Sequence, residues 1–86
     1  MFITYAIFNE NDKIYIGQTS DLEKRMKRHN GILRSKKKPF TSNNKGIWKV
    51  AYVEEFSTRE EAVKREKQLK SFQGRKFIRD ILESIK

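Results

Sequence analysis

Residues 14–30 read IYIGQTSDLEKRMKRHN, and this stretch decides the fold because it changes from a strand into a basic helix. It opens with β-branched and aromatic side chains and turns at a glycine. Glu23 follows Ser20 by three positions, which is the capping-box pattern, so we expect a helix to begin near Asp21. The helix should stop at Asn30 and the glycine after it, a common pairing at helix C-termini. It carries four Lys and Arg residues and the only histidine of the chain, so its role depends on whether these side chains face solvent or the sheet.

The segments before and after this stretch complete one small domain, residues 1–86. Ser57 and Glu60 form a second capping box, at which another helix should open and run to about Lys70. The expected strands are residues 2–8, 13–17 and 48–56, and a final helix carries Phe77, Ile78, Ile81, Leu82 and Ile85 at amphipathic spacing. The order β-β-α-β-α-α predicts an α/β (α+β) fold with a small antiparallel three-stranded sheet flanked by helices.

Composition limits the class of protein. The 86 residues carry a formal net charge of +9 and include no cysteine and one histidine, which excludes a disulfide framework and argues against a structural zinc site. The N-terminus does not resemble a signal peptide, and no window is apolar enough to span a bilayer, so we expect a soluble cytoplasmic protein. The positive charge indicates a polyanionic partner, and we expect this partner to be DNA.

The positive charge is concentrated in one segment. Residues 24–53 contain no acidic residue but ten of the twenty Lys and Arg residues, and this asymmetry predicts a surface for phosphates. A merely well-solvated surface and an anionic membrane are the alternatives, although no helix shows the large apolar face that membrane binding requires. Phe40, in a polar basic loop at 34–46, could stack on bases. The expected nucleic-acid-binding residues are Lys24, Lys27, Arg28, Arg34, Lys36, Lys37, Lys38 and Lys45.

Two pairs of side chains could contribute to a site. Arg25 and His29 are four residues apart, so they lie side by side on one face of the expected helix, about 100° from its apolar stripe. Tyr5 and Tyr15 lie on the two hairpin strands at similar distances from the turn, so we expect them to be cross-strand neighbours. Paired tyrosines also serve packing alone, and an Arg–His pair on a helix can be incidental.

Glu66 adds a carboxylate to this set. It shares a helix face with Ala62 and Leu69, which are natural core contacts, and a carboxylate there is costly unless it is paired or binds a metal. A salt bridge with Arg25, or escape to solvent, would also account for it. Tyrosine, arginine, histidine and glutamate together are the parts needed for phosphodiester hydrolysis: Glu holds a divalent ion, Arg stabilises developing charge, and Tyr or His moves protons.

These residues resemble the GIY-YIG nuclease superfamily, in particular small stand-alone members similar to the N-terminal catalytic domain of the excision-repair nuclease subunit UvrC. The second signature is intact as Tyr15-Ile16-Gly17, and the first is degenerate as Ile3-Thr4-Tyr5, which keeps the tyrosine and loses the glycine. The helix pattern of residues 19–30 is the most specific part, and the similarity covers nearly the whole chain. Gln18 stands where many members carry a lysine, and no asparagine follows the glutamate helix.

The resemblance implies a catalytic set and a cofactor. The implied catalytic residues are Tyr5, Tyr15, Arg25, His29 and Glu66. Glu66 would be the single metal-binding residue, for one Mg²⁺ or Mn²⁺. One of the tyrosines would activate the water, and we prefer Tyr5 for this role, with Tyr15 positioning the water or the phosphate.

Two functions are compatible with these observations. The first is a metal-dependent endonuclease that hydrolyses phosphodiester bonds of DNA, with structure-selective or repair-related action. The second is a non-catalytic nucleic-acid-binding module that uses the same basic face. Because we expect no second domain, specificity would be weak or would come from a protein partner. The oligomeric state stays open.

Overall fold

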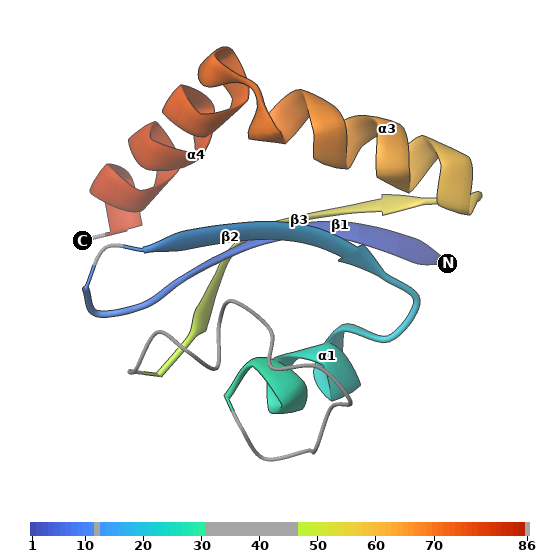
Figure 1. The fold of residues 1–86 in the computed structure, drawn as a ribbon, viewed down its shortest axis with the longest axis horizontal. Helices are drawn as coiled ribbons and strands as arrows, with labels where there is room; N and C mark the ends of the chain where they lie inside the picture. Colours follow the sequence, from blue (N-terminus) through green and yellow to red (C-terminus); the bar gives the residue numbers. More distant parts are fainter. Residues whose placement is uncertain (12, 31–46, 86) are drawn as a thin grey trace.

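The computed structural model of the protein describes residues 1–11, 13–30 and 47–85. Within these ranges the chain forms three strands and three helices in the order β-β-α-β-α-α, as the sequence predicts (Figure 1). Their bounds are β1 Phe2–Phe8, β2 Ile14–Thr19, α1 Leu22–His29, β3 Lys49–Phe56, α3 Arg59–Lys70 and α4 Phe72–Ile85.

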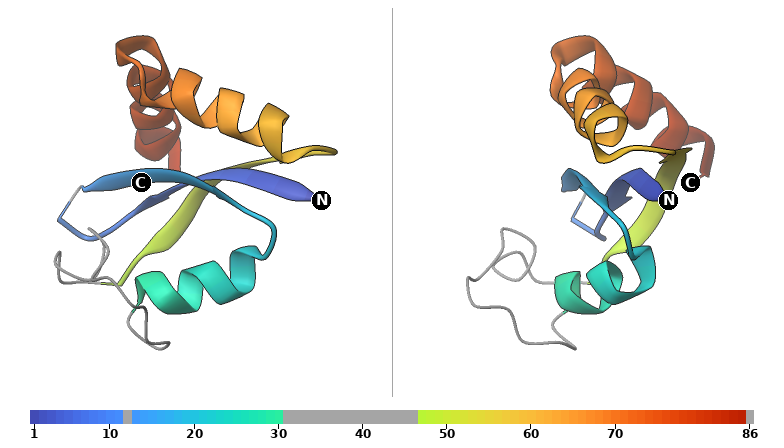
Figure 2. Two further views of the ribbon diagram at one scale, coloured as in Figure 1. Left: turned by 45° about the vertical axis from the view of Figure 1, so that its right-hand side comes forward. Right: turned by 90° about the vertical axis from the view of Figure 1, so that its right-hand side faces the viewer.

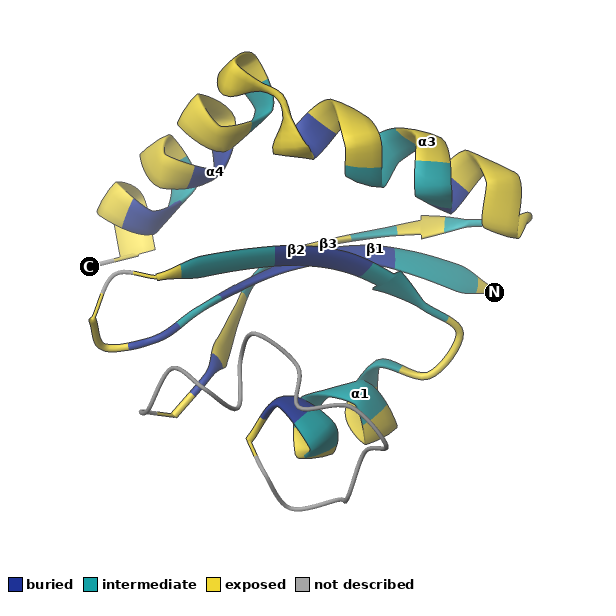
Figure 3. Ribbon diagram, in the orientation of Figure 1, coloured by how far each residue is buried: buried dark blue, intermediate teal, exposed yellow. Residues whose placement is uncertain are grey.

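The strands form one antiparallel sheet in the order β2-β1-β3, so β1 is its central strand. The helices α3 and α4 lie on one face of the sheet and α1 lies on the other (Figures 1 and 2). Burial is greatest along the middle of β1, where four successive residues are buried (Figure 3). Because successive side chains of a strand point to opposite faces, these residues supply both layers of the core.

The β1–β2 hairpin is held by the side chain at the end of β1. Asn9 is buried, and its Oδ1 accepts hydrogen bonds from the backbone N–H groups of Asn11 and Lys13, both at 3.0 Å. Asparagine is suited to this position because its side chain satisfies backbone donors that a turn leaves unpaired. The strand that follows extends to Thr19, two residues beyond the predicted end.

The layer between the sheet and the helices α3 and α4 is mainly aliphatic, and it also buries Thr4, whose hydroxyl donates to the carbonyl oxygen of Ala62 at 2.7 Å. Ile78 and Leu82 of α4 are buried as their spacing predicts, whereas Ile85 is 53% exposed and Phe77 is 42% exposed with its ring edge against Tyr52. The buried members of this cluster are Ala6, Ile16, Leu69, Ile78 and Leu82. The longest helix of the described residues is α4, with 14 residues. None of the helices in the described part of the chain is long and apolar enough to cross a membrane.

The layer between the sheet and α1 is built from larger and more polar residues. Its buried members are Tyr5, Ile7 and Trp48. Trp48 is therefore a core residue and precedes β3, instead of opening that strand as predicted. Asn30, at the C-terminus of α1, accepts from the backbone N–H of Trp48 at 2.7 Å and donates to its carbonyl oxygen at 3.3 Å. These two hydrogen bonds fix the end of α1 to the start of β3.

Both predicted N-caps are wrong by one residue. The N-cap of α1 is Asp21, whose side chain accepts from the backbone N–H of Lys24, instead of Ser20. The N-cap of α3 is Thr58, which accepts from the backbone N–H of Glu61, instead of Ser57. In each case the adjacent residue is an equally good capping type, so tertiary packing decides which of the two is used.

Candidate active site

The candidate site is centred on Tyr5, which lies on β1 and faces α1. Its side chain is fully buried, and its hydroxyl oxygen lies 2.7 Å from Nε2 of His29. Arg25 donates from Nε to the same oxygen at 3.4 Å. The helix positions Arg25 and His29 one turn apart on its inner face, as their spacing predicts. Three of the five predicted catalytic residues are therefore joined by hydrogen bonds.

Burial sets the protonation states of this cluster. Burial raises the pKa of Tyr5 to about 12, and the hydrogen bond from Arg25 opposes this shift only in part. Burial and the nearby charge of Arg25 lower the pKa of His29 to about 4. The hydrogen bond with Tyr5 raises the pKa of Arg25. At neutral pH the cluster therefore holds a phenol, a neutral imidazole and a permanent positive charge.

Tyr15 lies beside this cluster and is less buried. Its ring centroid is 4.9 Å from that of His29 and 6.3 Å from that of Tyr5. The two tyrosines are not direct cross-strand partners, because the register pairs Tyr5 with Gly17 and Tyr15 with Ile7. They are diagonal neighbours on one face of the sheet, which is still within the reach of aromatic side chains.

Gly17 is the last residue of the second signature, and its role in the site becomes clear only from the sheet. It lies directly across from Tyr5 in the sheet. A Cβ atom at this position would lie 2.9 Å from the hydroxyl oxygen of Tyr5 and 3.0 Å from Cε1 of Tyr15. The glycine therefore provides the space in which both rings fit, and the strand register is the signal that reveals it.

Glu66 approaches the site from the opposite layer. Ala62 and Leu69 are buried while the Glu66 side chain is 20% exposed, so the three residues share the inner face of α3. Its carboxylate is close enough to raise the pKa values of both Tyr5 and Arg25. Its ion-pair partner is Lys70, at 2.6 Å, and not Arg25.

The donors near Glu66 can be compared with what a hard divalent ion needs. Within residues 1–11, 13–30 and 47–85, no three His, Cys, Asp or Glu side chains are grouped so that they could hold a metal ion. A single carboxylate still fits Mg²⁺ or Mn²⁺, because such ions often keep several waters and complete their shell with substrate phosphates. Glu66 has the right ligand chemistry for this, provided that Lys70 releases its oxygen.

The basic residues of α1 fall into two groups. Lys24, Arg25 and Arg28 line a hollow of about 330 Å³ at the start of the helix. Lys27 lies outside this hollow and forms an exposed ion pair with Glu23 at 3.8 Å. Five of the predicted nucleic-acid-binding residues lie outside the described part of the chain: Arg34, Lys36, Lys37, Lys38 and Lys45. Phe40, which is predicted to stack on bases, also lies outside it.

Comparison with known proteins identifies the family of this chain. A profile of the GIY-YIG catalytic domain matches residues 1–77. The chain belongs to the GIY-YIG family. UPF0213 protein SSP2268 of Staphylococcus saprophyticus is similar to this GIY-YIG chain, being 32% identical over 79 residues that cover 92% of each protein. No solved structure matches the sequence.

Membership of the GIY-YIG family carries a general expectation about chemistry. Domains of this family are usually endonucleases, generally use a divalent metal ion, and act on nucleic acid. In this chain Ile3 replaces the glycine of the first signature, and it packs against the buried cluster that contains Tyr5. The degenerate signature therefore contributes to the core beside the candidate site.

Proposed function

We propose that this protein is a metal-dependent DNA endonuclease that hydrolyses phosphodiester bonds. The observation that carries the proposal is the hydrogen-bonded cluster of Tyr5, His29 and Arg25, with Tyr15 against its open side. A binding surface has no use for a buried polar cluster of this kind, because exposed cations alone attract phosphates. Polar groups held in a fixed arrangement are what a reaction with developing charge requires.

Arg25 is the residue that would stabilise the reacting phosphate. Its guanidinium has five N–H donors. Among the described residues, the one hydrogen bond that it donates runs from Nε to the hydroxyl oxygen of Tyr5. Tyr5 thus fixes the plane of the guanidinium while the remaining donors stay available for phosphate oxygens. Arg25 also lines the hollow at the start of α1, together with Lys24, Arg28 and the N-cap Asp21. A phosphate bound there would meet three positive charges and one negative charge.

Tyr15 is our candidate to contact the attacking water, which reverses the preference expected from the sequence. What supports this assignment is burial: Tyr5 has no exposed surface and a pKa of about 12, so it is a poor base. Tyr5 instead accepts from Arg25 and shares a hydrogen bond with His29, which suits a residue that positions its neighbours. His29, neutral at physiological pH, packs against both tyrosine rings.

Glu66 would hold the divalent ion, which we take to be Mg²⁺ or Mn²⁺. Such an ion, when bound, supplies Lewis-acid stabilisation of phosphate oxygens and lowers the pKa of bound water. The charge of Glu66 raises the pKa values of Tyr5 and Arg25, which supports this assignment because the carboxylate is then near the residues that would contact the reacting phosphate. Lys70, its partner at 2.6 Å, would then be free to contact phosphate.

The test is nicking of supercoiled plasmid with and without Mn²⁺. Wild-type protein should nick the plasmid only with the metal, and Glu66→Gln should abolish nicking and Mn²⁺ binding by calorimetry. Glu83→Gln is the matched control, because Glu83 is an exposed glutamate on α4. Mn²⁺ binding that survives Glu66→Gln would refute the assignment of the ligand.

A non-catalytic nucleic-acid-binding module is the second candidate. The observation that favours it is the Lys70–Glu66 ion pair, which occupies a carboxylate oxygen that a metal would need. Plasmid binding without nicking at any Mn²⁺ or Mg²⁺ concentration would support this module and reject the nuclease.

We further propose that the nuclease selects its substrate by the structure of the DNA. A structure-selective or repair-related nuclease should prefer branched, flapped or nicked duplexes over intact ones at matched concentration. Comparing single-turnover rates on such substrates tests this preference directly. Equal rates on all of them would indicate that selectivity comes from a partner protein.

A further inference from the structure

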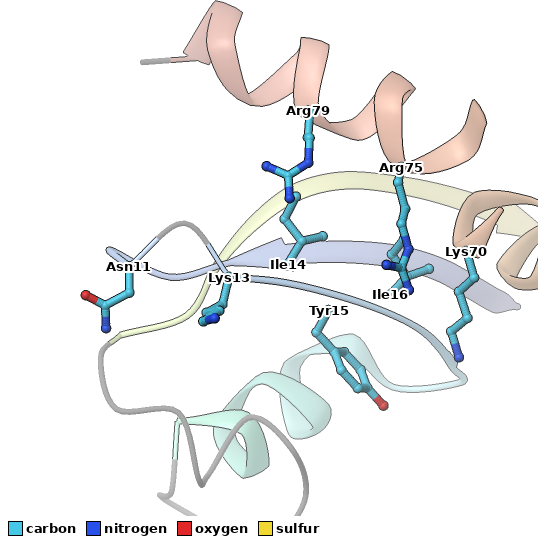
Figure 4. Close-up of a pocket in the computed structure, with 8 residues that line it drawn as sticks. All are labelled: Asn11, Lys13, Ile14, Tyr15, Ile16, Lys70, Arg75 and Arg79. Carbon is cyan, nitrogen blue, oxygen red and sulfur yellow. The ribbon is translucent and has the colours of Figure 1, made fainter. Parts of the chain in front are cut away.

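A second positively charged cleft, distinct from the hollow at the start of α1, runs along the outer edge of the sheet. It has a volume of about 470 Å³ and lies between β2 and the helices α3 and α4. Figure 4 shows Arg75 and Arg79 extending from α4 toward β2, with Lys70 reaching down from the end of α3. Lys13, just before β2, completes a set of four cations. The apolar floor consists of Ile14 and Ile16.

The positive charge of this cleft is not balanced locally. None of the described residues that line it is acidic. Among the same residues Lys13, Arg75 and Arg79 have no ion-pair partner, whereas Lys70 pairs with Glu66. Arg75 and Arg79 are four residues apart on one helix face, an arrangement in which like charges repel and destabilise the helix. Packing therefore gives no reason for the two arginines to face the same strand.

Protection of the sheet edge explains only part of this arrangement. A charged residue on an edge strand prevents pairing with another chain, and Lys13 next to β2 suits that purpose. Arg75 and Arg79 come from a helix, however, and extend over the strand from outside the sheet (Figure 4). Guanidinium groups are planar forks that match phosphate oxygens, so a pair of them above an apolar floor is suited to a sugar–phosphate strand.

The cleft shares one wall with the candidate active site. Tyr15 lines the cleft, while its ring extends to the other side of β2, away from Arg75 and Arg79 (Figure 4), and lies 4.9 Å from the ring of His29. A strand whose reacting phosphate lies at Arg25 would therefore enter the cleft after passing around the edge of β2 at Tyr15. The two basic hollows flank the candidate site, because one lies at the end of β2 and the start of α1 and the other follows β2 along its edge.

We propose that this cleft binds the sugar–phosphate backbone of the nucleic acid, at phosphates beyond the one that is cut. The proposal rests on the proposed function for its substrate class. It assigns Arg75 and Arg79 a binding role that leaves the reacting atoms to Tyr15, Arg25 and Glu66. The two arginines should raise the affinity for DNA without changing the rate of the chemical step.

The test compares two double variants with the same loss of charge. Arg75→Gln/Arg79→Gln removes two cations from the cleft, and Lys64→Gln/Lys76→Gln removes two exposed cations of α3 and α4 that do not line it. Binding of a fluorescein-labelled duplex is measured by anisotropy in EDTA over a range of KCl concentrations. Each lost phosphate contact should reduce the slope of log affinity against log salt by about 1.

We expect the cleft variant to lose about two units of this slope and the control variant much less. Arg75→Lys/Arg79→Lys keeps both charges and should restore most of the slope, which shows that the loss does not come from misfolding. Equal slopes for the cleft variant and the control would overturn the proposal. So would displacement of the duplex from wild-type protein by inorganic phosphate at constant ionic strength, because the cleft would then be a site for a free anion.

Cleavage separates this inference from the proposed function. At saturating DNA with Mn²⁺, the cleft variant should cleave in single turnovers at the wild-type rate. A large loss of rate with unchanged affinity would place the arginines in the chemistry and overturn the inference. Absence of cleavage by wild-type protein would reject the nuclease, while the salt slopes would still decide whether the cleft binds nucleic acid.

Discussion

The two faces of the sheet bury different chemistry, although the same strands build them. On the face covered by α3 and α4 the buried side chains are aliphatic except for Thr4, whose hydroxyl donates to the carbonyl oxygen of Ala62 at 2.7 Å. On the face covered by α1 they include Tyr5, which is hydrogen-bonded to His29, and Trp48. Tyr5 and Ala6 are neighbours in sequence but belong to different faces. Strand alternation thus lets a chain of this size separate an aliphatic layer from a layer of aromatic and polar side chains.

The consequence is that substitutions on the two faces should have separable effects. The aliphatic layer mainly contributes to the free energy of unfolding, because it removes apolar surface from water and its buried Thr4 hydroxyl already has a hydrogen-bond partner. The polar layer positions charges and protons, and the aliphatic layer opposite it holds the central strand in place. A substitution that affects stability and activity in equal measure on either face would break this comparison.

The largest effect is expected from Ile78→Ala. Ile78 has no exposed surface and lies in the aliphatic cluster, so its truncation should lower the free energy of unfolding by about 2–5 kcal/mol. Urea denaturation measures this change. Ile85→Ala is the matched control on the same helix, because Ile85 is 53% exposed, and it should change stability by less than about 0.5 kcal/mol. Well below its unfolding temperature, the Ile78 variant should retain the wild-type cleavage rate.

Arg25→Ala should give the opposite result on the other face. In the proposed mechanism this substitution removes the charge beside the reacting phosphate, so the single-turnover cleavage rate should fall by about 10²–10³-fold. DNA affinity should change little, because Arg25 is one cation among twenty Lys and Arg residues. The control is Lys27→Ala, an exposed residue of the same helix that lies outside the hollow. A similar loss of rate in both variants would mean that general charge, and not the position fixed by Tyr5, governs the reaction.

Gly17→Ala should affect both quantities, because the new Cβ would meet the rings of Tyr5 and Tyr15. Overpacking of this kind costs about 1–3 kcal/mol of unfolding free energy. The displaced tyrosines should also reduce the cleavage rate. Gln18→Ala, at the next position and on the opposite face of the strand, is the control and should leave the rate unchanged. Wild-type rates for the glycine variant would show that the tyrosine positions tolerate movement.

Much of the fold could be predicted because its signals are local. The spacing of the apolar residues in α4 predicts which face of this helix is buried. The spacing of four between Arg25 and His29 predicts that they share a helix face, and both contact Tyr5. The N-caps were less predictable, since Ser57 and Thr58 each have a glutamate three residues later and sequence cannot choose between them.

The relations between elements were harder to predict than the elements. The diagonal offset of Tyr5 and Tyr15 depends on the hairpin register, which composition does not specify. Glu66 pairs with Lys70, one turn further along its own helix. This contact is local to α3, whereas a salt bridge with Arg25 would depend on how α3 and α1 are placed around the sheet. The arginine cleft depends on where α4 lies relative to β2. The periodicity of a single helix does not predict its position relative to a strand.

For a change of one pH unit, the smallest effect is expected from the titration of His29. The pKa of His29 is lowered from 6.5 to about 4 by burial and by the charge of Arg25, so the unfolded chain takes up this proton at higher pH than the folded protein does. The stability that comes from the neutral imidazole is complete above pH 6.5, falls as the pH drops toward about 4, and falls no further below that. The loss should be at most about 1.4 kcal/mol for each pH unit in this window.

Carboxylates titrate in the lower part of the same window, so the variant His29→Gln is needed to isolate the contribution of the histidine. Glutamine stays neutral and can still form a hydrogen bond with Tyr5. Urea denaturation of both proteins across the window should give a wild-type stability that falls more steeply with decreasing pH. Parallel profiles would mean that His29 takes up its proton as readily in the folded protein as in the unfolded chain. The polar face would then admit water, and the contrast between the two layers would be weaker than the burial of Tyr5 and His29 indicates.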